Sequence, residues 1–348
     1  MINPIVESDI KELILRKKYF EPFIGSSVLI TGATGLLGSL MVKSVSHYAG
    51  TVYTCCRSKT KFESVFEGYK AENIFPIFSD ITDLDISKLT VDYIIHAASP
   101  TDSKCFVEKP VDTITTAVEG TNHLLAQCIG KSLKGFIYLS SLEVYGFFPG
   151  CTGIKNVTET DYGYLEPMSI RSSYSESKRL VETLSKAYLS QYGVPVKIAR
   201  LCQTFGAGVR YNDNRVFAQF ARSVIEGKDI VLRTKGETVR NYCYTTDSIA
   251  GILTVLASGT AGDVYNVANK GTTISIADMA DLFCKLSPEN RSKVIFDIAE
   301  DAGKLGYNPT VKLQLDTSKL EKLGWRPEID LNDMICRLVE GMKNEKLV

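Results

Sequence analysis

The chain has 348 residues, of which 44% are hydrophobic and 23% charged, and its formal net charge is zero. This is a globular composition, and the length suffices for one large or two modest domains. The balanced charge argues against a nucleic-acid partner, and no polybasic run indicates a membrane surface. No apolar run approaches the roughly 20 residues that span a bilayer.

Cysteines and histidines give no sign of a disulfide framework or a metal centre. The nine cysteines are scattered without C-x-x-C pairs, and the first 24 residues lack the apolar core of a signal peptide. We therefore expect reduced thiols and a cytoplasmic protein. His47, His96 and His123 are dispersed, so the sequence predicts no metal site.

Residues 8–20 predict a short amphipathic helix ahead of the first strand. Ser8 and Asp9 are suitable N-cap residues, and apolar side chains follow them at helical spacing. We treat residues 1–24 as an N-terminal helical extension. Whether this helix packs on its own domain or on a neighbouring protein is left open.

A glycine-rich turn joins a predicted strand to a predicted helix in the segment 27–40, SVLITGATGLLGSL. In its G-x-x-G-x-x-G pattern, the first glycine permits the turn, the second lets a ligand approach the backbone, and the third lets helix and strand pack closely. Unpaired N–H groups and the positive helix end there suit a diphosphate. The alternative is an ordinary turn without a ligand. The predicted cofactor contacts in this turn are Gly32, Thr34, Gly35, Leu36, Leu37 and Gly38.

Strands and helices alternate from this turn to about residue 200. The predicted strands after the first are 51–56, 73–78, 93–97, 136–140 and 196–200, and the predicted helices are 38–48, 112–130 and 174–192. This alternation predicts an α/β fold of the Rossmann type, a doubly wound parallel sheet with helices on both faces. We expect residues 25–201 to form this dinucleotide-binding domain, with its ligand beyond the carboxyl ends of the strands.

The pattern loosens after residue 202, where loops rich in Gly, Asn and Asp separate short helices. The predicted helices in this part are 214–227, 245–258, 276–286 and 331–343. We expect residues 202–348 to form mainly a smaller C-terminal lobe that binds the substrate, while some of its segments return to the Rossmann sheet.

The end of the second predicted strand bears on the choice of cofactor. An NAD-binding unit usually has an acidic residue there, which holds the ribose hydroxyls. Cys56 occupies that position, and the following Arg57 can meet the 2′-phosphate of NADP. Arg57 modestly favours NADP over NAD; the alternative is a solvated loop charge, with the ribose held by other groups. Further predicted cofactor contacts are Ser58, Asp80, Ile81, Ala97, Ala98, Ser99, Tyr174 and Lys178. His96 is either beside the cofactor or a buried histidine with satisfied hydrogen bonds.

Tyr174 and Lys178 are four residues apart on a predicted helix and therefore share one face. We expect the lysine charge to lower the pKa of the tyrosine. The phenolate could then exchange a proton with a sugar hydroxyl while a hydride moves to a nicotinamide. Ser141, at the end of the preceding strand, can share that hydrogen bond. These residues predict a catalytic centre; the alternative is a dinucleotide-sensing protein that keeps the fold without the reaction.

With these motifs the chain resembles the extended short-chain dehydrogenase/reductase family, the NAD-dependent epimerase/dehydratase group that acts on nucleotide sugars. The resemblance covers about residues 26–343 and includes LDTSK at 315–319 and LGWRP at 323–327. It implies NAD as the usual cofactor, a smaller lobe for a nucleotide-diphosphate sugar, and a homodimer formed through the helices 112–130 and 174–192.

Within this family the chain most resembles the UDP-glucuronate decarboxylases. Glu143 stands where the decarboxylases and 4,6-dehydratases keep a glutamate, and Leu142 stands where the dehydratases keep an acidic aspartate. The run NDNRV at 212–216 resembles a decarboxylase stretch whose arginine lies near the sugar carboxylate. The resemblance thus implies a catalytic role for Arg215; a structural arginine is the alternative.

The implied reaction is oxidation at C4 of the sugar, loss of CO2 and return of the hydride to C4. Ser141 and Tyr174 would bond the enolate oxygen, and Glu143 and Arg215 would manage the carboxylate and the proton delivered to C5. Arg240 resembles the arginine that the family directs at the substrate diphosphate, with a surface salt bridge as the alternative. The implied substrate contacts are Ser99, Pro100, Ser141, Glu143, Gln203, Arg215 and Arg240.

The chain also departs from the decarboxylase pattern. Those enzymes usually show N-T-[FY]-G-P-R, whereas this chain has QTFGAG at 203–208. An epimerase acting on a nucleotide-diphosphate sugar is therefore the second candidate, and a 4,6-dehydratase is the third.

Overall fold

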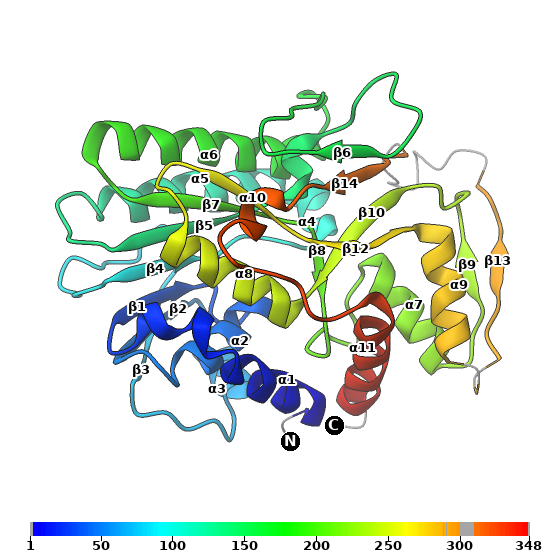
Figure 1. Ribbon diagram of the computed structural model, residues 1–348, viewed down its shortest axis with the longest axis horizontal. Helices are drawn as coiled ribbons and strands as arrows, with labels where there is room; N and C mark the ends of the chain where they lie inside the picture. Colours follow the sequence, from blue (N-terminus) through cyan, green and yellow to red (C-terminus); the bar gives the residue numbers. More distant parts are fainter. Residues whose placement is uncertain (1–2, 288, 290, 300–309, 347–348) are drawn as a thin grey trace.

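A seven-stranded parallel sheet in the order β11-β7-β5-β4-β1-β2-β3 lies at the centre of the protein (Figure 1). The computed structural model describes residues 3–287, 289, 291–299 and 310–346. The sheet strands are β1 (Ser27–Thr31), β2 (Thr51–Cys56), β3 (Ile74–Phe78), β4 (Tyr93–His96), β5 (Gly135–Ser141), β7 (Val196–Leu201) and β11 (Val264–Val267). The predicted doubly wound parallel sheet is confirmed.

Helices cover both faces of this sheet. One face carries α5 (Pro110–Ala126) and α6 (Ser172–Tyr192), and the other carries α2 (Leu36–Val45) and α8 (Thr245–Ser258). Successive residues of β1 serve the two faces in turn, because side chains alternate along a strand. Leu29 belongs to the core beneath α5 and α6, whereas Val28 and Ile30 belong to the core beneath α2 and α8.

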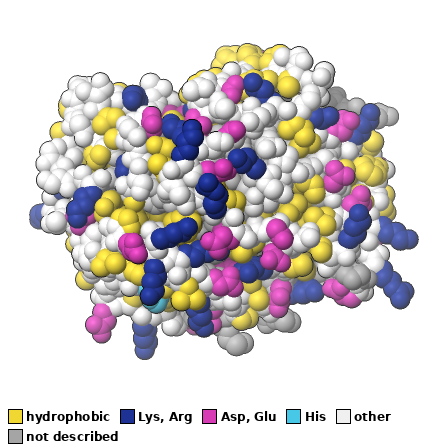
Figure 2. Space-filling view, viewed as in Figure 1, with side chains coloured by type: hydrophobic (Ala, Val, Ile, Leu, Met, Phe, Trp, Pro, Cys, Tyr) yellow, Lys and Arg dark blue, Asp and Glu magenta, His cyan; other side chains and the backbone are white. Residues whose placement is uncertain are grey.

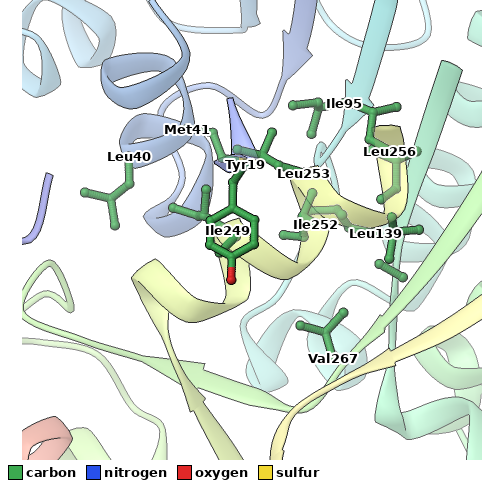
Figure 3. Close-up of a cluster of buried hydrophobic side chains, with 14 of the residues drawn as sticks. Tyr19, Leu40, Met41, Ile95, Leu139, Ile249, Ile252, Leu253, Leu256 and Val267 are labelled. Atoms are coloured by element: carbon green, nitrogen blue, oxygen red, sulfur yellow. The ribbon is translucent and has the colours of Figure 1, made fainter. Parts of the chain in front are cut away.

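The core beneath α2 and α8 shows how the two halves of the chain share one interior. Figure 3 draws this cluster, in which the labelled side chains are Tyr19, Leu40, Met41, Ile95, Leu139, Ile249, Ile252, Leu253, Leu256 and Val267. Both α8 and β11 come from beyond residue 202, and β11 extends the sheet by pairing with β7. Segments of the C-terminal half therefore complete the central sheet and its cover.

The smaller lobe is built on a three-stranded sheet in the order β12-β10-β8. Its strands are β8 (Gln203–Phe205), β10 (Val239–Tyr244) and β12 (Asn269–Ser275), and its helices are α7 (Val216–Ile225), α9 (Ile276–Leu286) and α11 (Leu331–Lys346). A separate buried cluster, which includes Phe217, Phe283 and Met334, joins the three helices.

Short parallel pairs of strands link distant parts of the chain. β6 (Lys155–Val157) pairs with β14 (Leu313–Leu315), and β9 (Ile230–Leu232) pairs with β13 (Val294–Phe296). None of these strands was predicted, since three residues are too few to show a period of two. The short helices α3 (Lys59–Val65) and α10 (Ser318–Glu321) complete the part of the fold used below.

The N-terminal helix α1 spans Pro4–Leu15 and not residues 8–20 as predicted. Asn3 is its N-cap, because the side-chain oxygen of Asn3 accepts the N–H of Ile5 at 3.1 Å, and Pro4 stands in the first turn. Ser8 and Asp9 therefore lie inside the helix. The helix lies beside α11, and Figure 1 shows the two chain ends close together. Asn3 donates a hydrogen bond of 2.8 Å to the carbonyl oxygen of Gly341.

Charges of both signs are interspersed over the face shown in Figure 2, in keeping with the formal net charge of zero. Over the residues that the structure describes, no helix has both the length and the apolar character needed to cross a membrane.

Candidate active site

In the turn between β1 and α2, Gly32 and Gly38 have the roles that were predicted for the first and third glycines of the pattern. Gly32 has a φ of 67°, and a Cβ at this position would lie 2.7 Å from the carbonyl oxygen of Ala97. A Cβ on Gly38 would lie 2.1 Å from the carbonyl oxygen of Gly32. Glycine is therefore required at the first position for the turn and at the third for the close packing of α2.

The N-terminus of α2 fits an anionic group. Its N-cap is Gly35, which provides no side-chain hydrogen bond to the first turn. The first N–H groups of a helix lack intrahelical acceptors, and the helix dipole is positive at this end. The backbone after β4 passes beside the same turn, since a Cβ on Gly32 would lie 2.9 Å from the nitrogen of Ala98. These residues fit the diphosphate of a dinucleotide.

Arg57 and Asp80 lie near one another at the carboxyl ends of β2 and β3. Arg57 Nη1 is 3.9 Å from Asp80 Oδ2, and the Arg57 side chain is 79% exposed. Ser58 caps α3 by accepting the N–H of Lys61 at 3.1 Å. Two of the predicted cofactor contacts, Arg57 and Asp80, therefore stand at the same edge of the sheet. Ile81 is buried.

His96 is a buried histidine with satisfied hydrogen bonds. Its two ring nitrogens lie 2.8 Å from the hydroxyl of Thr31 and 2.9 Å from that of Thr121. Burial, assisted by the charge of Lys178, lowers the pKa of His96 to about 3. The ring is therefore neutral at physiological pH, and it supports the carboxyl end of β4 from within the core.

Tyr174 and Lys178 share one face of α6, as their spacing predicts. Lys178 Nζ lies 5.6 Å from the centroid of the Tyr174 ring. It donates a hydrogen bond of 2.8 Å to the carbonyl oxygen of Leu139 on β5. Burial lowers the pKa of Lys178 to about 7. The lysine is thus held between α6 and the central sheet.

The pKa of Tyr174 shifts in the direction opposite to the one expected. Burial raises this pKa to about 12, although the nearby side chain of Ser141 acts to lower it. The expectation that Lys178 produces a net lowering is wrong for this structure. Burial penalises the phenolate, and it also disfavours the charged form of the lysine.

Glu143 lies between two arginines from different parts of the chain. It belongs to the single turn 142–145 that follows β5, and its Oε1 is 3.7 Å from both Arg171 Nη2 and Arg240 Nη1. The charges of Glu143, Arg171 and Arg215 all act on the pKa of Tyr174. The structure therefore brings the predicted Glu143 and Arg215 near the tyrosine, together with Arg171, which was not predicted as a site residue.

Arg215, just before α7, is paired with a carboxylate of its own loop. Its Nε and Nη2 donate to Asp213 at 2.7–3.1 Å, and its Nη1 lies 3.5 Å from the carbonyl oxygen of Thr204. The side chain remains 31% exposed. The guanidinium is thus anchored on one side and accessible on another.

Arg240 is largely buried on β10 and is not a solvated surface arginine, because its side chain is only 13% exposed. Its Nε has no hydrogen-bond partner among the described residues. A buried donor without a partner is costly, so this position fits a polar ligand group. Gln203 lies on the neighbouring strand β8, which pairs with β10. Ser99 and Pro100 follow β4 and are half-buried.

The sequence did not predict the helix α4 (Ser103–Glu108) or a role for Phe106, whose ring is stacked on that of Tyr174. A signal was present. Asp102 is a good N-cap residue, and its carboxylate accepts the N–H of Lys104 at 3.0 Å. The helix is too short for its apolar side chains to show a period.

The chain is similar in sequence to known proteins of one family. A model of the NAD dependent epimerase/dehydratase family matches residues 28–268. UDP-glucuronic acid decarboxylase 6 of Arabidopsis thaliana is 27% identical over 329 residues, which cover 91% of this chain and 88% of the relative.

Solved structures of this family share the fold. The epimerase Mth375 of Methanothermobacter thermautotrophicus has a TM-score of 0.80 at 20% identity, with coverage of 95% of this chain and 96% of that one. UDP-glucuronic acid 4-epimerase from Bacillus cereus, in complex with NAD, has a TM-score of 0.75 at 23% identity, with coverage of 91% and 99%. The chain belongs to the NAD dependent epimerase/dehydratase family.

Proposed function

We propose that this protein is a UDP-glucuronate decarboxylase with a tightly bound nicotinamide cofactor. The observation that carries the proposal is the position of Glu143, which lies 3.7 Å from Arg171 and from Arg240 beside the buried Tyr174. A reaction that loses CO2 needs cationic groups for the sugar carboxylate and a proton donor for the carbon left behind. This cluster contains both kinds of group.

Tyr174 and Ser141 are assigned to the oxygen at C4. Tyr174, whose pKa the nearby side chain of Ser141 acts to lower, would take the proton of the C4 hydroxyl. A bound nicotinamide would supply the acceptor for the C4 hydride and return the hydride at the end of the cycle. The resulting carbonyl lies β to the carboxylate, so the bond to the carboxylate carbon can break with its electron pair delocalised onto the C4 oxygen. Ser141 and Tyr174 would then hydrogen-bond to that enolate oxygen.

Glu143 and Arg215 are assigned to the other end of the reaction. Arg215 would hold the carboxylate until CO2 leaves, since a guanidinium binds a carboxylate in two-point geometry. Glu143 would take up a proton from solvent and deliver it to C5 after CO2 has left. Arg240, with its unpartnered Nε, is assigned to the diphosphate, beside Gln203, Ser99 and Pro100.

The second candidate is an epimerase acting on a nucleotide-diphosphate sugar. One observation favours it: Asp213 already pairs with Arg215 at 2.7 Å. Because this carboxylate compensates the arginine, the site does not require an acidic sugar for charge balance.

Incubation of the purified protein with UDP-glucuronate distinguishes these candidates. We expect release of CO2 and formation of a UDP-pentose or its 4-keto form. Absence of CO2, together with inversion at C4 or C5 of a nucleotide-diphosphate sugar in NMR spectra, would replace the decarboxylase with the epimerase. The mass and absorbance of the co-purifying cofactor would decide between NAD and NADP, of which Arg57 favours NADP.

We also assign a homodimer formed through α5 and α6. Exposed apolar side chains remain on both helices, among them Val111 and Ile114 on α5 and Leu180 on α6. Burial of such side chains against a second copy would stabilise the association. Sedimentation of the wild type and of Leu180→Glu tests this assignment, which requires a smaller species for the variant.

We also place the protein in a reducing compartment, such as the cytoplasm. All nine cysteines are free, as expected of thiols in such a compartment.

A further inference from the structure

Phe106 is an aromatic residue in direct contact with the ring of Tyr174. The two ring centroids are 4.2 Å apart, and the ring planes differ by 11°. Both side chains are buried, with exposed fractions of 4% for Phe106 and 8% for Tyr174. One face of the tyrosine ring is therefore covered by a side chain that belongs to neither the glycine turn nor the tyrosine–lysine motif.

The backbone at Phe106 is fastened to the helix that carries the tyrosine. The hydroxyl of Ser173, the residue before Tyr174, donates a hydrogen bond of 2.9 Å to the carbonyl oxygen of Phe106. The neighbouring carbonyl of Cys105 accepts a hydrogen bond of 3.3 Å from the hydroxyl of Thr113 on α5. α4 is thus tied to both α5 and α6, and the backbone that carries the Phe106 ring cannot move away from α6 without breaking these contacts.

Phe106 also contacts the arginine next to Glu143. The guanidinium carbon of Arg171 lies 5.1 Å from the centroid of the Phe106 ring, a distance typical of a cation–π contact. The same guanidinium lies 3.7 Å from the Glu143 carboxylate. One phenyl ring therefore touches two of the charged or titratable groups that surround the reaction site.

We propose that Phe106 is a positioning residue: its ring blocks displacement of the Tyr174 ring towards α4 and so holds the phenol hydroxyl at Ser141, where it meets the C4 oxygen of the sugar. The identity of the sugar rests on the proposed function. The position of the phenol is a property of the protein alone and is tested separately below.

The kinetic test uses Phe106→Leu, which removes the aromatic face but keeps most of the volume, and Phe106→Tyr, which restores the ring. Val107→Ala is the matched control, because Val107 lies on the same helix and is 52% exposed. We expect kcat of Phe106→Leu with UDP-glucuronate to fall roughly 10- to 100-fold, as for a small misplacement of a reacting group, with KM unchanged. Phe106→Tyr should recover most of this loss, and Val107→Ala should match the wild type. Wild-type kcat in Phe106→Leu would overturn the proposal, and so would an equal loss in Phe106→Tyr.

A measurement without substrate separates this proposal from the decarboxylase assignment. In protein labelled isotopically at tyrosine Cζ, loss of one NMR signal in Tyr174→Phe identifies the signal of Tyr174. Loss of the stacked ring in Phe106→Leu should shift that signal, whereas Val107→Ala should leave it in place. An unshifted signal in folded Phe106→Leu contradicts the positioning role. A wild-type protein that is inactive on UDP-glucuronate contradicts only the decarboxylase, and the NMR comparison still decides whether the Phe106 ring packs on Tyr174, on which the positioning role depends.

Discussion

Arg240 Nη1 lies 3.7 Å from Glu143 Oε1, which joins the two lobes at the candidate site. Glu143 follows β5 of the central sheet, and Arg240 lies on β10 of the smaller sheet. Arg171, just before α6, approaches the same oxygen at the same distance. The carboxylate thus holds in place two guanidinium groups that would otherwise repel one another.

Glu143→Gln should separate anion binding from turnover. In this variant no carboxylate compensates the positive charges of Arg171 and Arg240. We therefore expect the affinity of the protein for the UDP diphosphate to rise by up to about fivefold. Because the proton donor for C5 is removed, kcat should fall by roughly 100-fold or more. Calorimetric titration with UDP and a turnover assay measure the two effects. Glu63→Gln, which removes a carboxylate of α3 that is 62% exposed, is the control. Weaker UDP binding in Glu143→Gln would contradict the assigned geometry.

Tyr174→Phe should remove turnover and preserve cofactor binding. The phenol is the assigned acid and base at C4, and loss of such a group lowers kcat by roughly 100- to 10,000-fold. The phenylalanine keeps the ring that stacks on Phe106, so the fold should be unaffected. Turnover and the amount of co-purifying nicotinamide are measured on the same preparation. Wild-type turnover in this variant would show that the site is misassigned.

Arg57→Ala tests the choice of cofactor. The guanidinium is 79% exposed at the end of β2, and a hydrogen bond between charged groups contributes about 1.5–3 kcal/mol. We expect the variant to lose roughly tenfold or more of its affinity for NADP while its affinity for NAD is unchanged. Titration of cofactor-free protein with each dinucleotide gives both values, and Lys59→Ala on the neighbouring exposed position is the control. Equal losses for the two cofactors would remove the reason to favour NADP.

His96 should make the protein sensitive to acid. Burial lowers its pKa to about 3 in the folded state from an ordinary value of 6.5, so between these values the unfolded chain binds a proton that the folded protein does not. Stability is therefore lost as the pH falls below 6.5, by about 2 kcal/mol between neutral pH and about pH 5. Urea unfolding at both pH values measures this loss. His96→Asn should be less stable at neutral pH but should lose less on acidification; an identical pH dependence would rule out His96 as the source.

Arg16→Ala should destabilise the attachment of the N-terminal helix. Arg16 Nη1 lies 2.6 Å from Asp247 Oδ1, with exposed fractions of only 11% and 0% for the two side chains. Removing one member of a buried ion pair typically costs about 3–5 kcal/mol. We expect the free energy of unfolding in urea to fall by about 3 kcal/mol, with no comparable change in Lys17→Ala, where the side chain is exposed. A decrease of less than about 1 kcal/mol in the free energy of unfolding would contradict this expectation, because the Arg16–Asp247 pair would then contribute no more than an exposed ion pair does.

Long periodic segments could be predicted closely from the sequence. The predicted ranges 245–258 and 276–286 coincide with α8 and α9, and the predicted strand 51–56 coincides with β2. α9 buries one face, so its apolar side chains recur with the period of a helix. α8 is buried on all sides from Thr245 to Leu256, so its signal is a long apolar run. The start of α1 was misplaced because Ser8 and Asp9 resemble caps, whereas the Asn3–Pro4 pair is the actual start.

The sequence by itself determined the glycine turn, the tyrosine–lysine pair and the alternation that builds the parallel sheet, because each depends on residues close together in the chain. Only the tertiary structure decided that Phe106 stacks on Tyr174 and that Glu143 lies between Arg171 and Arg240, since these contacts join separate elements. It also decided the direction in which the pKa of Tyr174 shifts. The tyrosine–lysine motif places a positive charge near Tyr174, which by itself would lower the pKa of the phenol. Burial raises that pKa by more, and burial is produced by the whole fold.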